Sequence, residues 1–184
     1  MPTNLRKDAV RSRRAILDAA RKLYRDDAEA SFADIAHAAE VGQATVYRHF
    51  ADRRALLMAL ADEDMDGLEE RLASEPIGPG SLEELLRRMV AGQLRSQGLI
   101  AAIRAGEVEE SQVERLTERV RALMAPRLEA ARAAGVVRAD LTDDDALLVL
   151  AMVDGAAAPL RDRDERERAS ARAFEIALEG LKRG

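Results

Sequence analysis

The sequence predicts an all-α protein, and three observations support this fold class. The chain has 184 residues, of which 47% are hydrophobic and 34% charged, a composition that suits helices with a sizeable core. Apolar residues recur at the three- and four-residue spacing of amphipathic helices. Glycine and proline occur in few places, and no strand-like alternation appears between them.

The first half of the chain predicts four helices, of which the second and third are short. The first covers about residues 7–25. The second begins near Ser31, whose hydroxyl can cap it, and a break at residues 40–42 separates it from the third. The fourth begins after Asp52, another capping residue, and ends near residue 73.

The second half predicts longer helices and two loops, which lie at residues 74–80 and 133–145. The spacing of apolar residues places them at residues 81–94, 98–106, 109–134, 146–160 and 166–181. Ser81 with Glu84, and Thr142 with Asp145, have the spacing of capping boxes.

Charge is unevenly distributed along the chain. Residues 1–25 carry eight basic and two acidic side chains, a net charge of +6. Residues 1–54 hold eleven bases and eight acids, so of the 29 bases and 34 acids in the chain, 18 and 26 fall in residues 55–184. A basic head on an acidic body indicates a nucleic-acid-binding segment, although the whole chain has a net charge of −5.

The stretch VGQATVYRHFADRRALL at residues 41–57 is the most informative part of the sequence. Two short helices joined by a three-residue turn near a basic N-terminus form a candidate helix-turn-helix, which places its second helix in the DNA major groove. Val41, Val46 and Phe50 can pack inward, which leaves the polar side chains of the helix free to face DNA.

Chemistry divides the predicted DNA contacts into two groups. Gln43, Ala44 and Thr45 are predicted to read bases, and Arg48 can contact a guanine or a phosphate. Phosphate contacts, which position the protein without reading sequence, are predicted for Tyr47, His49 and Arg53. Ser31 and Arg14 are also predicted to contact DNA.

Residues 13–60 resemble the DNA-binding domain of TetR-family transcriptional regulators, most specifically in TVYRHF followed by RRALL. The resemblance implies a helix-turn-helix domain at residues 1–54 and a helical effector-binding and dimerisation domain at residues 55–184. It further implies a homodimer that binds a double-stranded DNA operator. We expect a repressor that a small-molecule effector releases from DNA.

Three residues depart from the family pattern. Glu40 stands where glycine is common in the turn, so we expect the turn to do without the left-handed conformation that glycine permits. Gly42 replaces a common serine or threonine cap, and Arg53 replaces a lysine while keeping its charge.

The resemblance also implies a small-molecule pocket among the central helices. Apolar and adaptable side chains that could line it, together with one polar residue in an apolar stretch, are Met89, Gln93, Ile103, Met124, Leu128 and Met152. Such residues at helical spacing can equally be plain core.

The apolar segment at residues 146–160 has more apolar surface than one subunit can easily cover. Together with the last helix it predicts a two-fold four-helix interface. The predicted interface residues are Val149, Val153, Ala156, Phe174, Leu178 and Leu181. Burial of this segment within the monomer is the alternative.

Other classes of protein fit the sequence less well. The chain has no cysteine, and its two histidines, His37 and His49, lie twelve residues apart without further ligands, so we expect no enzyme, metal site or cofactor. It lacks both a membrane-spanning run and an N-terminal signal core, so we expect a soluble, cytoplasmic protein. A helical scaffold that does not bind DNA explains the charged helices but not the TVYRHF motif.

Overall fold

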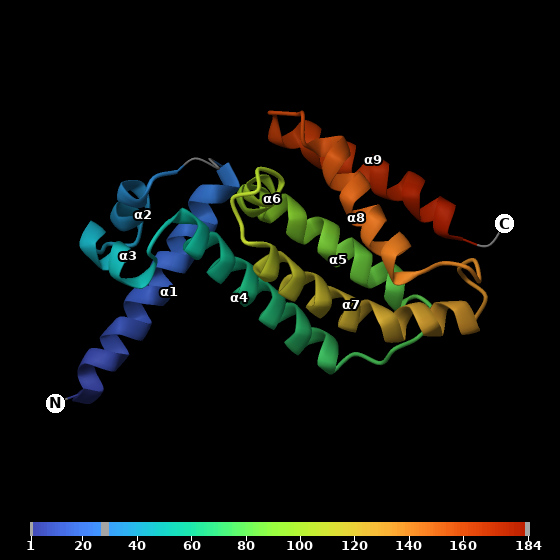
Figure 1. Ribbon diagram of the computed structural model, residues 1–184, viewed down its shortest axis with the longest axis horizontal. Coiled ribbons are helices and arrows are strands. Elements are labelled where there is room, and N and C mark those ends of the chain that lie inside the picture. The colour runs from blue at the N-terminus through green and yellow to red at the C-terminus, as the bar shows by residue number, and fades with distance from the viewer. Residues whose placement is uncertain (1, 27–29, 183–184) are drawn as a thin grey trace. The chain divides into compact units, whose positions relative to one another are not determined.

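A computed structural model describes the backbone of residues 2–26 and 30–182, and the side chains of residues 7–24 and 30–182 (Figure 1). Over these residues the chain forms nine α-helices and no β-strand, which confirms the predicted all-α fold. The described segments contain no helix that is long and apolar enough to cross a membrane.

The chain divides into two compact units. The first comprises residues Met1–Leu68 and Arg95–Glu109, and the second comprises Glu69–Leu94 and Glu110–Gly184. The predicted functional boundary between residues 54 and 55 is a different kind of division and stays a prediction.

The first unit contains α1 (Pro2–Asp26), α2 (Phe32–Ala38), α3 (Gln43–His49), most of α4 (Arg53–Ala73) and α6 (Gln97–Arg104). Its core is built from the inward faces of four of these helices. The side chains with no exposed surface include Ile16, Leu17 and Ala20 of α1, Ile35 of α2, Val46 of α3 and Leu56 of α4. These are the periodic apolar positions of the sequence, so burial of one face per helix holds the unit together.

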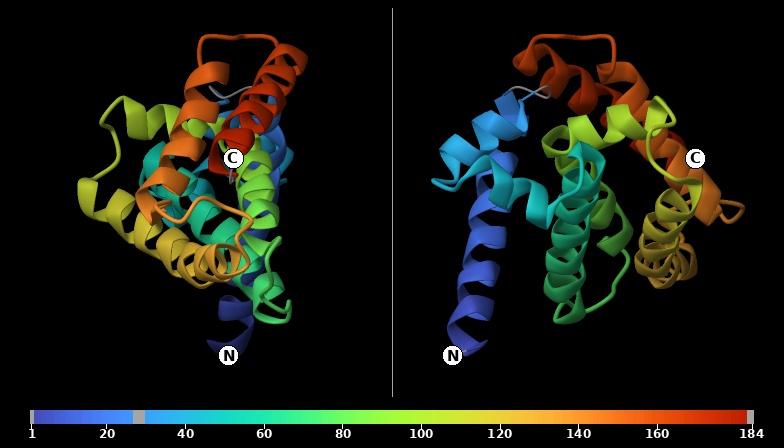
Figure 2. Two further views of the ribbon diagram at one scale, coloured as in Figure 1. Left: turned by 90° about the vertical axis from the view of Figure 1, so that its right-hand side faces the viewer. Right: turned by 60° about the vertical axis from the view of Figure 1, so that its left-hand side comes forward.

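The second unit contains α5 (Ser81–Arg95), α7 (Glu110–Ala133), α8 (Asp143–Ala157) and α9 (Arg163–Leu181), together with the end of α4. Helices α8 and α9 lie side by side along their lengths (Figure 2). Their facing sides bury Val149, Val153 and Phe174.

Helices α1 and α8 start at Pro2 and Asp143, earlier than the predicted residues 7 and 146, whereas α5 starts at Ser81 as predicted but without the predicted cap. Ser81 does not form a capping box, because it lies inside α5 and its hydroxyl accepts from the Gly78 amide at 2.9 Å while Glu84 pairs with Arg88 at 2.8 Å. Helix α9 starts three residues earlier than predicted, because Asp162 caps it. The Thr142–Asp145 capping box of α8 is present as predicted.

Candidate DNA-binding site

The turn between α2 and α3 ends α2 with a residue in the left-handed backbone conformation. Glu40 has a φ of 54°, the Val41 amide donates to the Ala36 carbonyl at 3.0 Å, and the Glu40 amide donates to the His37 carbonyl at 3.2 Å. Our expectation that the turn does without the left-handed conformation is therefore wrong. Glu40 adopts it despite its Cβ atom, because these bonds satisfy the last carbonyls of α2.

Helix α3 has one buried and one exposed face. Val46 is fully buried and Phe50, which ends the helix, is 4% exposed, so these two side chains anchor α3 to the core as predicted. Gln43, Ala44 and Arg48 are exposed. The seven-residue helix starts at Gln43, and Gly42 before it provides no side-chain cap, so tertiary packing positions the helix rather than its own propensity.

Tyr47 of α3 packs against the start of α2, where Ser31 is the N-cap. The Tyr47 ring packs on Phe32 with 5.0 Å between centroids, yet the residue stays 54% exposed. Packing fixes the ring while the residue remains open to a ligand. The Ser31 hydroxyl donates to the Asp34 carboxylate at 2.6 Å and accepts from its amide at 3.2 Å, so the serine serves as the cap of α2. The hydrogen bonds that the Ser31 hydroxyl and the Ser31 amide donate to the Asp34 carboxylate lower the pKa of Asp34.

His49 lies in the last turn of α3 and is partly buried. Its Nε2 atom is buried and has no hydrogen-bond partner within the described residues. Burial, with the nearby positive charges of Arg48 and Arg13, lowers the pKa of His49. The lowered pKa favours the neutral form of the His49 imidazole.

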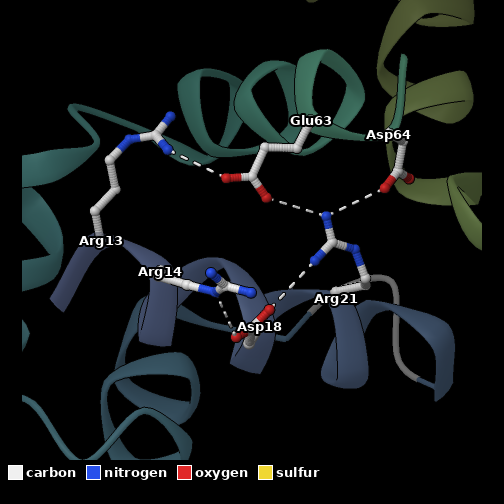
Figure 3. Close-up of polar contacts among 6 residues, drawn as sticks. All are labelled: Arg13, Arg14, Asp18, Arg21, Glu63 and Asp64. Carbon is white, nitrogen blue, oxygen red and sulfur yellow. Dashed lines mark hydrogen bonds and ion pairs between the residues drawn. The ribbon is translucent and has the colours of Figure 1, made fainter. Parts of the chain in front are cut away.

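An ion-pair network joins α1 to α4 inside the first unit (Figure 3). The Arg21 guanidinium lies 3.2 Å from Glu63 and 3.1 Å from Asp64, and Arg13 lies 3.3 Å from Glu63. Burial alone would lower the pKa of Arg21, but the two carboxylates raise it above its ordinary value. Arg13 also stacks on the Phe50 ring, with its Cζ atom 5.5 Å from the ring centroid, so it ties α1 to both the end of α3 and α4.

The network reduces the net positive charge of the basic head at residues 1–54. Glu63 and Asp64 fall outside the segment counted from the sequence, and they neutralise part of its positive charge.

Arg14 keeps its side chain 83% exposed, with only a 4.0 Å contact to Asp18. Lys7, Arg11 and Lys22 are also exposed, and the side chains of Arg6 and Arg25 lie outside the described residues. Arg53 begins α4, and its Cζ atom lies 5.4 Å from the Tyr24 ring centroid.

Two family models match the sequence of the chain. Residues 79–183, more than half of the chain, match the model described as "Transcriptional regulator SbtR-like, C-terminal domain", and residues 16–60 match "Bacterial regulatory proteins, tetR family". The chain belongs to the TetR family. TetR-family proteins are DNA-binding transcriptional regulators rather than enzymes, so the resemblance stated from the sequence is confirmed.

Similar proteins of known name or structure agree with this assignment. The chain is 42% identical over 84 residues to the HTH-type transcriptional repressor LfrR of Mycolicibacterium smegmatis, a match that spans 46% of this chain and 44% of that repressor. A TetR regulator of Mycobacterium vanbaalenii is 28% identical with a TM-score of 0.66, over 97% of this chain and 99% of that one. One of Streptomyces coelicolor is 27% identical with a TM-score of 0.64, over 92% and 98%.

In this TetR-family regulator, the residues predicted to form a ligand pocket are divided between the two units. Ile103 lies on α6 in the first unit, whereas the other five lie in the second. Met124 and Leu128 are buried, Met152 is 48% exposed, and the Gln93 amide donates to the Leu150 carbonyl at 3.2 Å. Two cavities of about 430 and 300 Å³ in the second unit are lined by other residues.

Most residues predicted for the dimer interface are buried within one chain. Val149, Val153, Phe174, Leu178 and Leu181 are each at most 6% exposed within one chain, and Ala156 is exposed. Other large apolar side chains are exposed on the same two helices, namely Leu148 at 55%, Met152 at 48% and Ile176 at 58%. The sequence could have indicated the α8 pair, because positions 148, 152 and 156 repeat every four residues on one helical face.

Proposed function

We propose that this TetR-family regulator is a dimeric repressor that reads operator DNA with α3 and is released from it by a small-molecule effector. The observation that carries the proposal is the two-faced α3. Val46 and Phe50 fix it to the core, while Gln43, Ala44 and Arg48 present donors, acceptors and a methyl group outward. These are the groups that distinguish base edges in the major groove.

Repression is supported by the printed name of a similar protein, the transcriptional repressor LfrR. The match covers less than half of that protein, so repression by this chain is our inference. We further propose that the regulator acts in the cytoplasm, where bacterial DNA is found.

Dimer formation is supported by the exposed apolar surface of α8 and α9. Leu148, Met152 and Ala156 form one row on α8, and Ile176 is exposed on α9. Large exposed apolar side chains on paired helices are typical of an interface. We propose that this row, rather than the buried residues predicted from the sequence, faces the second copy.

Effector control is supported by the path of the chain. The backbone passes between the two compact units three times, after residues 68, 94 and 109, and α6 belongs to the unit that contains α3. Within that unit, the Arg54 guanidinium donates to the Glu107 carbonyl at 3.2 Å, so the segment after α6 is bonded to the start of α4. We propose that an effector bound in the second unit acts on the first through these connections, provided that it binds two arrangements with different affinity.

A gel-shift experiment tests the proposed function. The full-length protein is titrated into DNA from upstream of its own gene and into genomic fragments, at two salt concentrations. We expect saturable binding to selected fragments that weakens steeply at the higher salt, because phosphate contacts release counterions. A variant with Gln43→Ala and Thr45→Ala is the control and should lose the preference among fragments. Failure of the wild-type protein to bind any fragment in a salt-dependent way would refute DNA-binding regulation.

A further inference from the structure

A surface cavity of about 300 Å³ lies in the second unit between the loop at residues 74–80, the start of α5 and α7. Its volume is at the lower end of the range for small-molecule sites, roughly 300–1,000 Å³. Leu72, Pro76, Ile77 and Pro79 give it apolar walls, and Arg127 of α7 is the most buried charged residue that lines it.

Arg127 is a buried charge with few interactions of its own. It is 4% exposed, and its Nη1 atom donates to the Leu123 carbonyl of the preceding helical turn at 2.8 Å. No carboxylate of the described residues lies within ion-pairing distance of its guanidinium. A guanidinium has five N–H donors, and burying one without a paired anion is unfavourable, so the remaining donors favour an anion in the cavity.

The two carboxylates that line the cavity are engaged by another residue. Arg88 of α5 lies 2.8 Å from Glu75 and 2.8 Å from Glu84, and the charge of Arg127 acts on Glu75 more weakly than Arg88 does. The hydrogen bond from Arg88 is also the main reason that the pKa of Glu75 is lowered. These negative charges near the site repel a doubly charged phosphate more strongly than an anion of single charge, so the second is the better ligand.

The loop wall is fixed before any ligand binds. The Ser81 hydroxyl accepts from the Gly78 amide at 2.9 Å, and the Ser81 amide donates to the Gly78 carbonyl at 3.0 Å. A wall that is already folded reduces the entropy that binding would otherwise cost. Ile77 stays 48% exposed on this loop, where it can contact the apolar part of a ligand.

We propose that this cavity binds a small organic monocarboxylate, whose carboxylate accepts hydrogen bonds from Arg127 and whose apolar part contacts Leu72, Pro76 and Ile77. A planar carboxylate matches the fork of a guanidinium and makes charge-assisted bonds with it. Binding itself follows from the cavity, whereas a role for the ligand as effector rests on the proposed function.

Isothermal titration calorimetry on the full-length protein tests the site. The probes are octanoate, benzoate and phenylacetate, with 1-octanol as the uncharged counterpart of octanoate. We expect saturable binding of at least one carboxylate at millimolar concentration or below. Arg127→Met should weaken it at least about tenfold without changing any weak binding of 1-octanol, because only the charge-assisted bonds are lost.

Arg121→Met is the matched control, because Arg121 also lies on α7 but pairs with Asp144 and does not line the cavity. It should bind the carboxylates like the wild-type protein. Ile77→Glu is a second variant on the exposed loop, and it should weaken carboxylate binding about tenfold by adding a negative charge. Thermal unfolding checks that each variant is folded.

The site is overturned if the wild-type protein binds none of the three carboxylates, or if Arg127→Met and Ile77→Glu bind them as tightly as it does. Gel shifts are run separately on the same preparations. DNA binding without carboxylate binding would reject this site and leave the proposed function standing. Carboxylate binding without DNA binding would support the site and reject that function.

Discussion

Glu40 shows how a single residue sets the geometry of the helix-turn-helix. Its φ of 54° lies in the left-handed region, which costs a residue with a Cβ atom roughly 1 kcal/mol or more. The bonds from the Glu40 and Val41 amides to the end of α2 hold it there. The sequence indicated an unusual residue in the turn, but it could not indicate that the turn would keep its usual conformation.

Replacing Glu40 by glycine should therefore stabilise the protein. We expect a gain of roughly 0.5–1 kcal/mol in the free energy of unfolding, because glycine relieves the strain but loses more entropy on folding. Glu40→Ala is the control, since alanine keeps the Cβ atom and should bring no such gain. Thermal unfolding of the three proteins checks this, and equal stability of the glycine and alanine variants would contradict the strain argument.

His49 should make stability depend on pH. Its pKa is lowered in the folded protein by burial and by Arg48 and Arg13, so the unfolded chain binds a proton more readily. Stability should therefore fall as pH drops below the ordinary histidine value of about 6.5, until the lower folded-state pKa is passed.

The measurement is the urea midpoint at pH 7.5 and at pH 5.5 for the wild-type protein, His49→Gln and His37→Gln. The His49 variant should lose less stability on acidification than the wild-type protein. His37 is exposed, so its replacement serves as the matched control and should keep the wild-type loss. A His49 variant with an unchanged loss would show that this histidine is not the cause.

At the scale of elements, apolar periodicity predicted where the helices lie better than how they begin. The fourth helix ends at Ala73 as expected, because periodicity reports the buried face. Ser81 and Glu84 had the spacing of a capping box, yet both side chains found partners elsewhere, Ser81 in the preceding loop and Glu84 in Arg88. Local spacing cannot show which of several available partners a side chain takes.

The same reasoning explains which parts of the candidate site were predictable. The inward and outward faces of α3 follow from helical period alone, and the structure has Val46 buried and Arg48 exposed as expected. Cavities depend instead on helices that are distant in the sequence. The contribution of Arg127 of α7 to the cavity beside the loop at residues 74–80 has no signal in either segment alone.

Helices α8 and α9 carry a prediction about assembly. A protein with Leu148→Glu and Ile176→Glu should be monomeric, because both side chains are exposed within one chain and the charges would be buried at the proposed interface. Its thermal stability per chain should be retained, unlike that of a variant at the buried Leu178. Light scattering measures the mass.

Val10→Glu is the matched control for this change, because Val10 is an exposed apolar residue on α1 and should not affect assembly. A dimer that persists in the double variant would place the interface elsewhere.

At the scale of the whole molecule, the two compact units follow from contacts rather than from the linear sequence. Helix α6 and its flanking residues 95–109 join the unit of α3, although they follow α5 of the other unit along the chain. A single boundary between residues 54 and 55 cannot describe two units that are each made of two separate segments of the chain. The interleaved path is what makes regulation of DNA binding from the second unit a reasonable proposal.

The central claim is that Gln43 and Thr45 of α3 read base sequence while other side chains, including Tyr47 of the same helix, hold phosphates. The most direct test is the relative affinity of the protein for a set of operator variants, each changed at one base pair. It is measured by fluorescence anisotropy for the wild-type protein, for Gln43→Ala with Thr45→Ala, and for Tyr47→Phe. The phenylalanine variant keeps the ring that packs on Phe32 and removes only the hydroxyl.

We predict that Tyr47→Phe lowers affinity by a similar factor for every operator variant, because a phosphate contact carries no sequence information. The variant at Gln43 and Thr45 should instead change the order of preference at particular base pairs, with about 1–3 kcal/mol of discrimination lost for each good base contact. An unchanged order of preference in that variant would contradict base reading by α3.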